Sequence, residues 1–169
     1  NDLWQVLKTQ HVKPGKGGAF AQVEMKSVGK NTKLNERFRS SETVEKASLE
    51  ETKFNYLYED ESYYFFMNPK SFEQIEIKKE VIGDQGKLLS ENLEVSVNFY
   101  NENPISVELP NQVKCKIETT DVALKGQTVS SSYKPATLKN GLNIQVPPFI
   151  EIGDEVIVDT RNLQYIKKI

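Results

Sequence analysis

The chain has 169 residues, of which 37% are apolar and 27% are charged, and its formal net charge is −2. This composition is typical of an ordinary globular protein, so a disordered or low-complexity chain is excluded. The single cysteine, Cys115, excludes an internal disulfide and favours a reducing, cytoplasmic home. No apolar stretch approaches the roughly 18 residues of a membrane span, so no membrane partner is expected.

The charge is unevenly distributed along the chain. Residues 1–46 carry a net charge of +4, residues 47–110 of −8 and residues 111–169 of +2. An acidic block between two basic ones suggests three separate units, and the basic ends are the better placed to approach polyanions.

The first block shows short alternating runs that predict strands at residues 3–10, 19–28 and 33–39. In the second run every other residue from Ala19 to Met25 is apolar and shares one face of the strand. Three or four strands in so short a block predict a small SH3-like barrel. The chain starts at Asn1, directly before a strand-like run, so we expect a few opening residues, and with them a strand, to be missing.

The second block predicts strands at residues 54–58, 63–67, 71–77, 94–100 and 105–109. A short helix is predicted at residues 83–92, with Leu88 and Leu89 facing inward. Five strands with one helix between the third and the fourth are the outline of an OB barrel.

The third block repeats this pattern, with strands predicted at residues 113–119, 142–146 and 156–159. Gly126, Gly141 and Gly153 are placed at turns, and the second and third blocks are expected to meet at residues 110–111. Because no region is rich in helix, the predicted fold class is all-β.

A glycine-rich segment joins the first two predicted strands. Pro14 and Gly15 fit a turn, and Gly17 and Gly18 let the chain return without steric cost. Lys16 then lies at the apex of a hairpin, where it can enter a narrow channel and where its ammonium suits a phosphate or a covalent modification. Glycine-rich hairpins also carry solvent-facing lysines that serve solubility, so the spacing alone does not decide between these roles.

Enzyme signatures are absent from the sequence. His11 is the single histidine, and neither a nucleophile elbow nor a phosphate-binding loop is present. A metal site built on His11 and Cys115 would need carboxylates from unknown positions, so we expect neither a metal nor a cofactor.

Two alternatives from other functional classes are left open. The carboxylates of residues 47–110 could serve a hydrolase or transferase, although they look like a solvated surface. The second barrel could also bind single-stranded nucleic acid, although a net charge of −8 counts against that reading. The aromatic residues available for stacking there are Tyr56, Tyr58, Tyr63 and Tyr64.

Several motifs, in the right order, resemble the bacterial translation elongation factor P family, and the resemblance covers essentially the whole chain. In the first two blocks they are Val12-Lys13-Pro14-Gly15-Lys16-Gly17, Asn55-Tyr56-Leu57-Tyr58, Phe66-Met67-Asn68, Pro104-Ile105-Ser106-Val107 and Leu109-Pro110-Asn111. In the third block they are Leu124-Lys125-Gly126, Lys134-Pro135-Ala136-Thr137-Leu138, Gly141, Val146-Pro147, Phe149-Ile150, Gly153-Asp154 and Val158-Asp159-Thr160-Arg161.

The resemblance implies an SH3/KOW-like domain at residues 1–46 and two OB-type domains at residues 47–110 and 111–169, in an L-shaped, tRNA-like arrangement. It implies a monomeric, non-enzymatic factor that binds the ribosome beside peptidyl-tRNA and relieves stalls at consecutive prolines. Lys16 occupies the family's modified tip position, where a modifying enzyme lengthens the lysine, often with a β-lysyl group. A paralogue with another stall preference is left open.

The resemblance also assigns supporting residues to the tip loop. His11, Lys13 and the backbone of its glycines, with Pro14 at the turn, are expected to hold the loop against ribosomal and transfer RNA. The run Ser130-Ser131-Ser132-Tyr133 departs from the family, whose members are richer in glycine in this loop, which is implicated in contacts with the small ribosomal subunit. Tyr133 could stack on a base or pack beside Pro135, and we favour packing.

Overall fold

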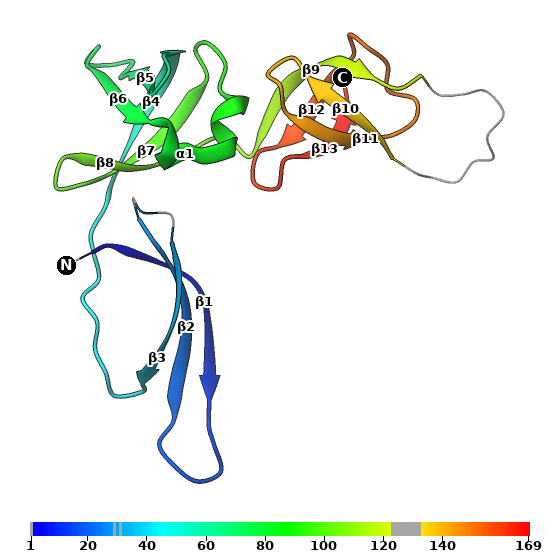
Figure 1. The fold of residues 1–169 in the computed structure, drawn as a ribbon. Coiled ribbons are helices and arrows are strands. Elements are labelled where there is room, and N and C mark those ends of the chain that lie inside the picture. Colours follow the sequence, from blue (N-terminus) through cyan, green and yellow to red (C-terminus); the bar gives the residue numbers. More distant parts are fainter. Residues whose placement is uncertain (1, 29, 31, 123–132) are drawn as a thin grey trace. The chain divides into compact units, whose positions relative to one another are not determined.

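The structure is a computed structural model that describes residues 2–28, 30, 32–122 and 133–169. The described strands form one sheet of three strands and two sheets of five (Figure 1). The all-β prediction is confirmed, because helix in the described residues is confined to one α-helical turn and one 3₁₀ helix. In this part of the chain no helix combines the length and the apolar character needed to cross a membrane.

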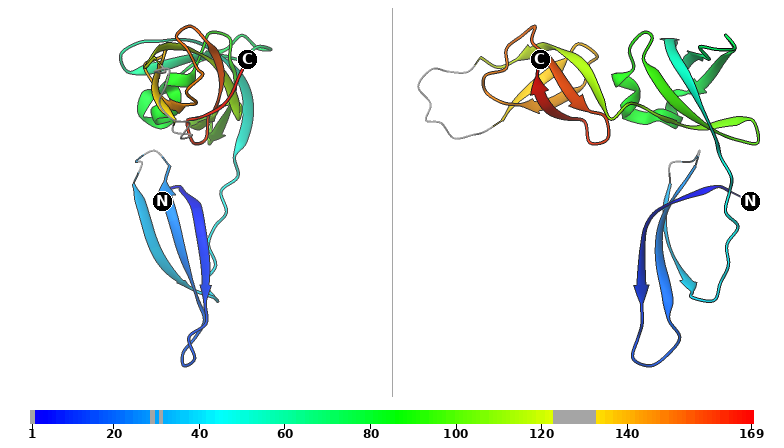
Figure 2. Two further views of the ribbon diagram at one scale, coloured as in Figure 1. Left: turned by 90° about the vertical axis from the view of Figure 1, so that its right-hand side faces the viewer. Right: turned by 180° about the vertical axis from the view of Figure 1, so that it is seen from behind.

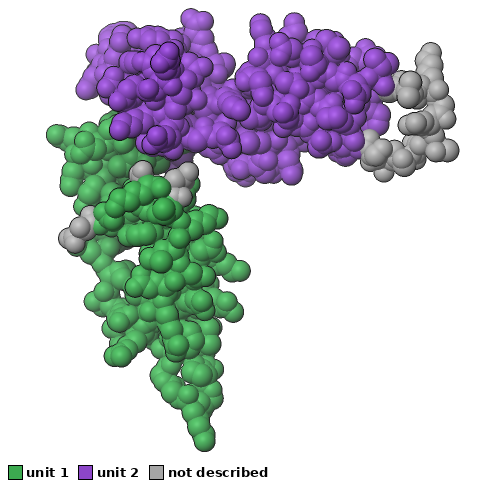
Figure 3. Space-filling view, in the orientation of Figure 1, with its two compact units in different colours: residues 1–52, 97–107 green, residues 53–96, 108–169 purple. Residues whose placement is uncertain are grey.

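The chain divides into two compact units (Figure 3). The first consists of residues 1–52 and 97–107, and the second of residues 53–96 and 108–169. This division does not test the domain boundaries predicted after residues 46 and 110, which stay predictions.

The three-stranded sheet lies in the first unit and has the order β1-β2-β3 (Figure 2). Its strands are β1 (Trp4–Val12), β2 (Phe20–Ser27) and β3 (Lys33–Arg39). In the central strand Val23 and Met25 are buried whereas Gln22 is exposed, which confirms the predicted alternation. Most of β1 is exposed, so the buried apolar core of this sheet is small.

The second block forms a five-stranded sheet with the order β6-β5-β4-β7-β8. Its elements are β4 (Glu50–Glu59), β5 (Tyr63–Met67), β6 (Gln74–Lys78), α1 (Lys79–Ile82), η1 (Gly83–Leu88), β7 (Glu94–Tyr100) and β8 (Asn103–Glu108). The strand predicted at residues 71–77 begins later than expected. Its first residues instead belong to a turn closed by Asn68, whose side-chain oxygen accepts hydrogen bonds from the backbone N–H groups of Lys70 and Ser71.

The helix predicted at residues 83–92 is confirmed in part: a helix does begin at Gly83, but it ends at Leu88 and one α-helical turn precedes it. Helical structure begins at Lys79, as one α-helical turn, and continues as the 3₁₀ helix η1. Gly83 has a φ of 69°, which ends the α-helical turn, and Gly86 lies directly against the Tyr64 ring. Leu88 is buried as predicted, whereas Leu89 is only half-buried because it follows the helix.

The third block forms a five-stranded sheet with the order β11-β10-β9-β12-β13, in which β11 also approaches β13. Its strands are β9 (Gln112–Thr120), β10 (Lys134–Leu138), β11 (Asn143–Val146), β12 (Glu155–Asp159) and β13 (Gln164–Lys168). Five strands that nearly close on themselves in this order are the OB arrangement. The turns predicted at Gly141 and Gly153 are confirmed by φ angles of 82° and 88°, whereas Gly126 lies outside the described residues.

Sequence periodicity missed β10 and β13. Pro135 lies within the first of these strands and argues against a strand there when the sequence is considered alone, although its carbonyl accepts a hydrogen bond from the Thr120 hydroxyl at 2.9 Å. The second is exposed over most of its length, so its residues lack the alternation that marks a half-buried strand.

Candidate functional site

The candidate site is the loop that joins β1 and β2 and projects from the end of the sheet (Figure 1). The two strands pair antiparallel, with His11 opposite Ala21 and Val12 opposite Phe20. Residues 13–19 therefore form the connection beyond the last pair. The predicted tip residues His11, Lys13, Pro14, Gly15, Lys16, Gly17 and Gly18 are all brought together there, and all are exposed.

The glycines keep this loop narrow around Lys16. Gly17 has a φ of 118°, a conformation that a residue with a side chain rarely adopts. A Cβ atom at Gly15 or Gly18 would meet no other atom within 4 Å, so the space beside both residues is open. Among the described residues neither Lys13 nor Lys16 takes part in an ion pair, which leaves both cations available to a partner.

Side-chain and backbone contacts at the base of the loop hold β2, the strand that follows the loop, in place. The Arg37 guanidinium carbon lies 3.3 Å from the centre of the Phe20 ring, and Ser40 donates its backbone N–H to the carbonyl of Ala19 at 3.2 Å. Glu42 accepts a hydrogen bond from the Arg39 backbone N–H at 2.9 Å. The sequence alone does not indicate these residues, because only the pairing of β2 with β3 places Phe20 opposite Arg39.

The loop predicted to contact the small subunit is only partly described. Ser130, Ser131 and Ser132 lie outside the described residues, whereas Tyr133 is 57% exposed just before β10. It lines a groove of about 450 Å³ together with Pro135, Asn143, Ile144, Gln145, Leu163, Gln164 and Tyr165. Tyr133 thus shares a groove with Pro135 while keeping exposed surface, so stacking on a base and packing both stay predictions.

The structure weakens the nucleic-acid alternative for the second barrel. Tyr56 and Tyr64 are 8% and 6% exposed and pack edge-on to each other inside the barrel, with ring centres 6.2 Å apart. Burial raises the pKa of Tyr56 to about 12 and also raises the pKa of Tyr64. Two of the four tyrosines considered for base stacking are therefore core residues.

The acid–base alternative finds no support in the carboxylates whose pKa is shifted. Within residues 47–110, the block considered for this role, the carboxylate whose pKa is shifted is Asp60, and hydrogen bonds from the backbone N–H groups of Ser62 and Tyr63 lower it. A general acid at neutral pH needs a raised pKa instead.

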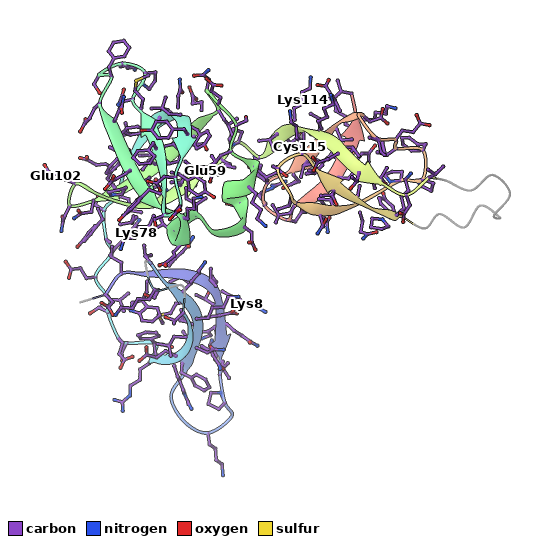
Figure 4. All side chains as sticks on the ribbon, turned by 45° about the horizontal axis from the view of Figure 1, so that its top comes forward. Lys8, Glu59, Lys78, Glu102, Lys114 and Cys115 are labelled. Atoms are coloured by element: carbon purple, nitrogen blue, oxygen red, sulfur yellow. The ribbon has the colours of Figure 1, made fainter. Side chains whose placement is uncertain are left out.

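No metal or nucleophile site emerges around His11 and Cys115. His11 lies in β1, and Cys115, which Figure 4 labels, lies in β9. Across the described ranges no group of three or more His, Cys, Asp or Glu side chains could hold a metal ion. Burial raises the pKa of the Cys115 thiol to about 11, so the reactive thiolate is scarce at neutral pH.

The fold and the site together define an all-β protein with OB-type barrels, whose first sheet presents one lysine on a glycine-framed hairpin. Three stretches of the chain match domains of one family. Residues 1–44 match the Elongation factor P (EF-P) KOW-like domain, residues 49–107 the Elongation factor P (EF-P) OB domain, and residues 113–168 Elongation factor P, C-terminal.

Curated relatives agree with these matches. Elongation factor P of Pelagibacter ubique is 80% identical over 169 residues, which cover 100% of this chain and 91% of the relative. Elongation factor P of Bartonella bacilliformis is 49% identical over 167 residues, covering 99% of this chain and 88% of the relative. The chain belongs to the elongation factor P family of translation elongation factors, which confirms the predicted KOW-like and OB-type domain classes.

One solved structure is also similar. The eukaryotic translation initiation factor 5A from Methanococcus jannaschii matches over 62% of this chain and 80% of that chain. The identity is 21% and the TM-score is 0.45.

Proposed function

We propose that this chain binds the ribosome beside peptidyl-tRNA and stimulates peptide-bond formation where consecutive prolines stall translation. The observation that carries the proposal is an exposed Lys16, free of ion pairs among the described residues, on a glycine-framed tip in a member of the elongation factor P family. In this proposal the protein acts as a monomer in the cytoplasm, catalyses no reaction itself and needs no cofactor.

The proposed mechanism is positioning of the transfer RNA end. Proline is a constrained peptidyl donor and acceptor, because its ring fixes φ and restricts the residue before it. Holding the reacting end in a productive pose can lower a barrier by several kcal/mol, since orientation entropy is lost in advance. A modifying enzyme lengthens Lys16, and the longer side chain extends from the tip toward the CCA end of the peptidyl-tRNA.

The rest of the tip supports that placement. Lys13 lies in the same exposed loop as Lys16, and His11 is exposed near the end of β1, which leads into that loop. The block of residues 1–46 has a net charge of +4, which favours RNA phosphate. Arg37 on Phe20 fixes the base of the loop, so that the lysine is presented at a defined position. In the third block, Tyr133 and Ser130–Ser132 are proposed to face the small subunit.

Reconstituted translation tests the proposal. Wild-type protein from its native host, where any modifying enzyme is present, should accelerate synthesis across three consecutive prolines and leave a proline-free template unchanged. Lys16→Ala should lose this acceleration, and Lys16→Arg should lose it too if the modification is required. Lys8→Ala removes an exposed lysine from β1, the strand that leads into the tip loop, and should keep full activity.

Two outcomes would count against the proposal. If wild-type protein affects neither template, the ribosomal role is wrong. If Lys16→Ala acts like wild type, the tip mechanism is wrong.

The modification itself is measured separately, by the intact mass of the native protein and of Lys16→Ala. It should add mass only where Lys16 is present. Reporters with other stall motifs distinguish a paralogue.

A further inference from the structure

The outer face of β4–β6 in the second unit carries an unusual exposed aromatic pair. The rings of Tyr58 and Phe65 stack with their centres 4.6 Å apart and an angle of 19° between their planes. Tyr58 is 54% exposed and Phe65 is half-buried, whereas Tyr56, Tyr64 and Phe66 point into the barrel. The stacked pair is therefore a surface feature and makes no contribution to filling the core.

The strand register places a carboxylate next to this pair. Phe65 is opposite Tyr58 on one side and opposite Glu76 on the other, so the three residues form a row across β4, β5 and β6. Glu76 is exposed and joins none of the ion pairs found among the described residues. The row thus offers an aromatic platform that continues directly into a negative charge.

Further charges surround this row. The β4–β5 turn adds Asp60 and Glu61, both exposed, and the Asp60 carboxylate is fixed by hydrogen bonds from the backbone N–H groups of Ser62 and Tyr63. Glu59, at the end of β4, is already paired with Lys79 at 2.7 Å. Lys78, at the end of β6, is a cation opposite Tyr63, and Figure 4 labels Glu59 and Lys78.

The charge of this region selects the class of partner. Residues 47–110 have a net charge of −8, which repels the phosphates of RNA. A cation that can stack on an aromatic ring and also bind a carboxylate fits the row instead. The arginine guanidinium does both, because it is planar, stacks on aromatic faces and donates hydrogen bonds to carboxylates in pairs.

The same chemistry already occurs within this chain. The Arg37 guanidinium lies 3.3 Å from the centre of the Phe20 ring in the first sheet. We propose that the row of Tyr58, Phe65 and Glu76 is a docking surface for an arginine-bearing segment of another protein. This surface is separate in sequence from the tip loop, and the proposal does not depend on the role of Lys16.

A titration followed by amide NMR tests this surface on the full chain. The probe is an acetylated, amidated heptapeptide of glycine and serine with two arginines, and its matched control replaces both arginines with lysine. The arginine peptide should shift the amides of Tyr58, Phe65 and Glu76 and bind about two- to fivefold more tightly than the lysine peptide.

Two variants and two controls sharpen the test. Tyr58→Ala and Glu76→Gln should each weaken the arginine peptide about two- to fivefold, because each removes one part of the row. Tyr133→Ala and Glu151→Gln remove an exposed tyrosine and an exposed carboxylate from the third block and should leave the affinity unchanged. Unchanged amide shifts away from the mutated site show that each variant is folded.

Three results would overturn the inference. Shifts scattered over the acidic block, without focus on the row, would mean unspecific attraction. Wild-type affinity in both Tyr58→Ala and Glu76→Gln would mean that the row is not the site. Equal or larger shifts of the same amides with a heptameric oligouridylate would make the face a nucleic-acid surface.

Discussion

Replacing Gly86 with alanine should destabilise the second barrel, because this buried glycine lies against the Tyr64 ring. A Cβ atom at position 86 would lie 2.3 Å from the Tyr64 hydroxyl oxygen, 2.6 Å from Cζ and 2.7 Å from Cε2. Tyr64 is 6% exposed and packs edge-on to Tyr56, so the ring cannot move without disturbing the core. Overpacking of this kind costs about 1–3 kcal/mol.

A smaller effect of the opposite sign accompanies the clash. Gly→Ala at a compatible backbone position stabilises by about 0.4–1 kcal/mol, because the unfolded chain loses freedom. We therefore expect Gly86→Ala to lower the free energy of unfolding by roughly 1 kcal/mol, because a mid-range overpacking cost of about 2 kcal/mol outweighs a mid-range gain of about 0.7 kcal/mol. Because the chain has two compact units and its one tryptophan, Trp4, is in the first, fluorescence would miss the effect. Amide hydrogen exchange in β5 reports it directly.

Matched variants isolate the cause. Gly18→Ala places a Cβ where no atom lies within 4 Å and should leave stability within about 0.5 kcal/mol of wild type. Gly86→Ala should cost less in a Tyr64→Leu background, because the atoms that clash are absent. Protection in β5 that is unchanged by Gly86→Ala, or a cost that is equal in both backgrounds, would refute the reasoning.

The remaining predictions concern two titrating groups. Burial raises the pKa of Cys115 to about 11 from 9.0, so alkylation by iodoacetamide at pH 8 should be about 100-fold slower in folded protein than in urea, and equal rates would contradict this. Hydrogen bonds from the Arg161 guanidinium and backbone N–H hold the pKa of Asp159 at about 2, below its ordinary 3.8. The depressed pKa stabilises the fold above about pH 4, and this contribution is lost as the pH falls toward 2. Asp159→Asn should thus lower the Tm at pH 7, and the difference from wild type should shrink between pH 4 and pH 2; a constant difference would show that Asp159 acts without its charge.

The parts of the fold that the sequence predicted best are strands bounded by turn residues, whether or not a face of the strand is buried. The runs at residues 33–39, 63–67 and 94–100 were predicted with the bounds that the structure has. In each case turn residues bound the run. Buried and half-buried residues alternate at residues 63–67, and consecutive residues are buried at 94–100. The predicted helix ran past Leu88, and the observed helix packs Gly86 against Tyr64, a tertiary contact between residues 22 positions apart. No local pattern contains that information.

Part of the candidate site could likewise be predicted from neighbouring residues, and part depends on contacts between residues that are distant in the sequence. Pro14, Gly15 and Gly17 require particular backbone conformations whatever surrounds them, so the tip and its lysine could be predicted from neighbouring residues alone. The contact of Arg37 with Phe20 at the base of the loop could not be predicted in this way, because it depends on the pairing of β2 with β3. A modified Lys16 can act at a distance only if the base of its loop is fixed. The contact of Arg37 with Phe20 is therefore as necessary to the proposed mechanism as the tip itself. If the tip sequence is kept but the contact of Arg37 with Phe20 is removed, we infer that Lys16 would still be exposed but would no longer be held at a defined position.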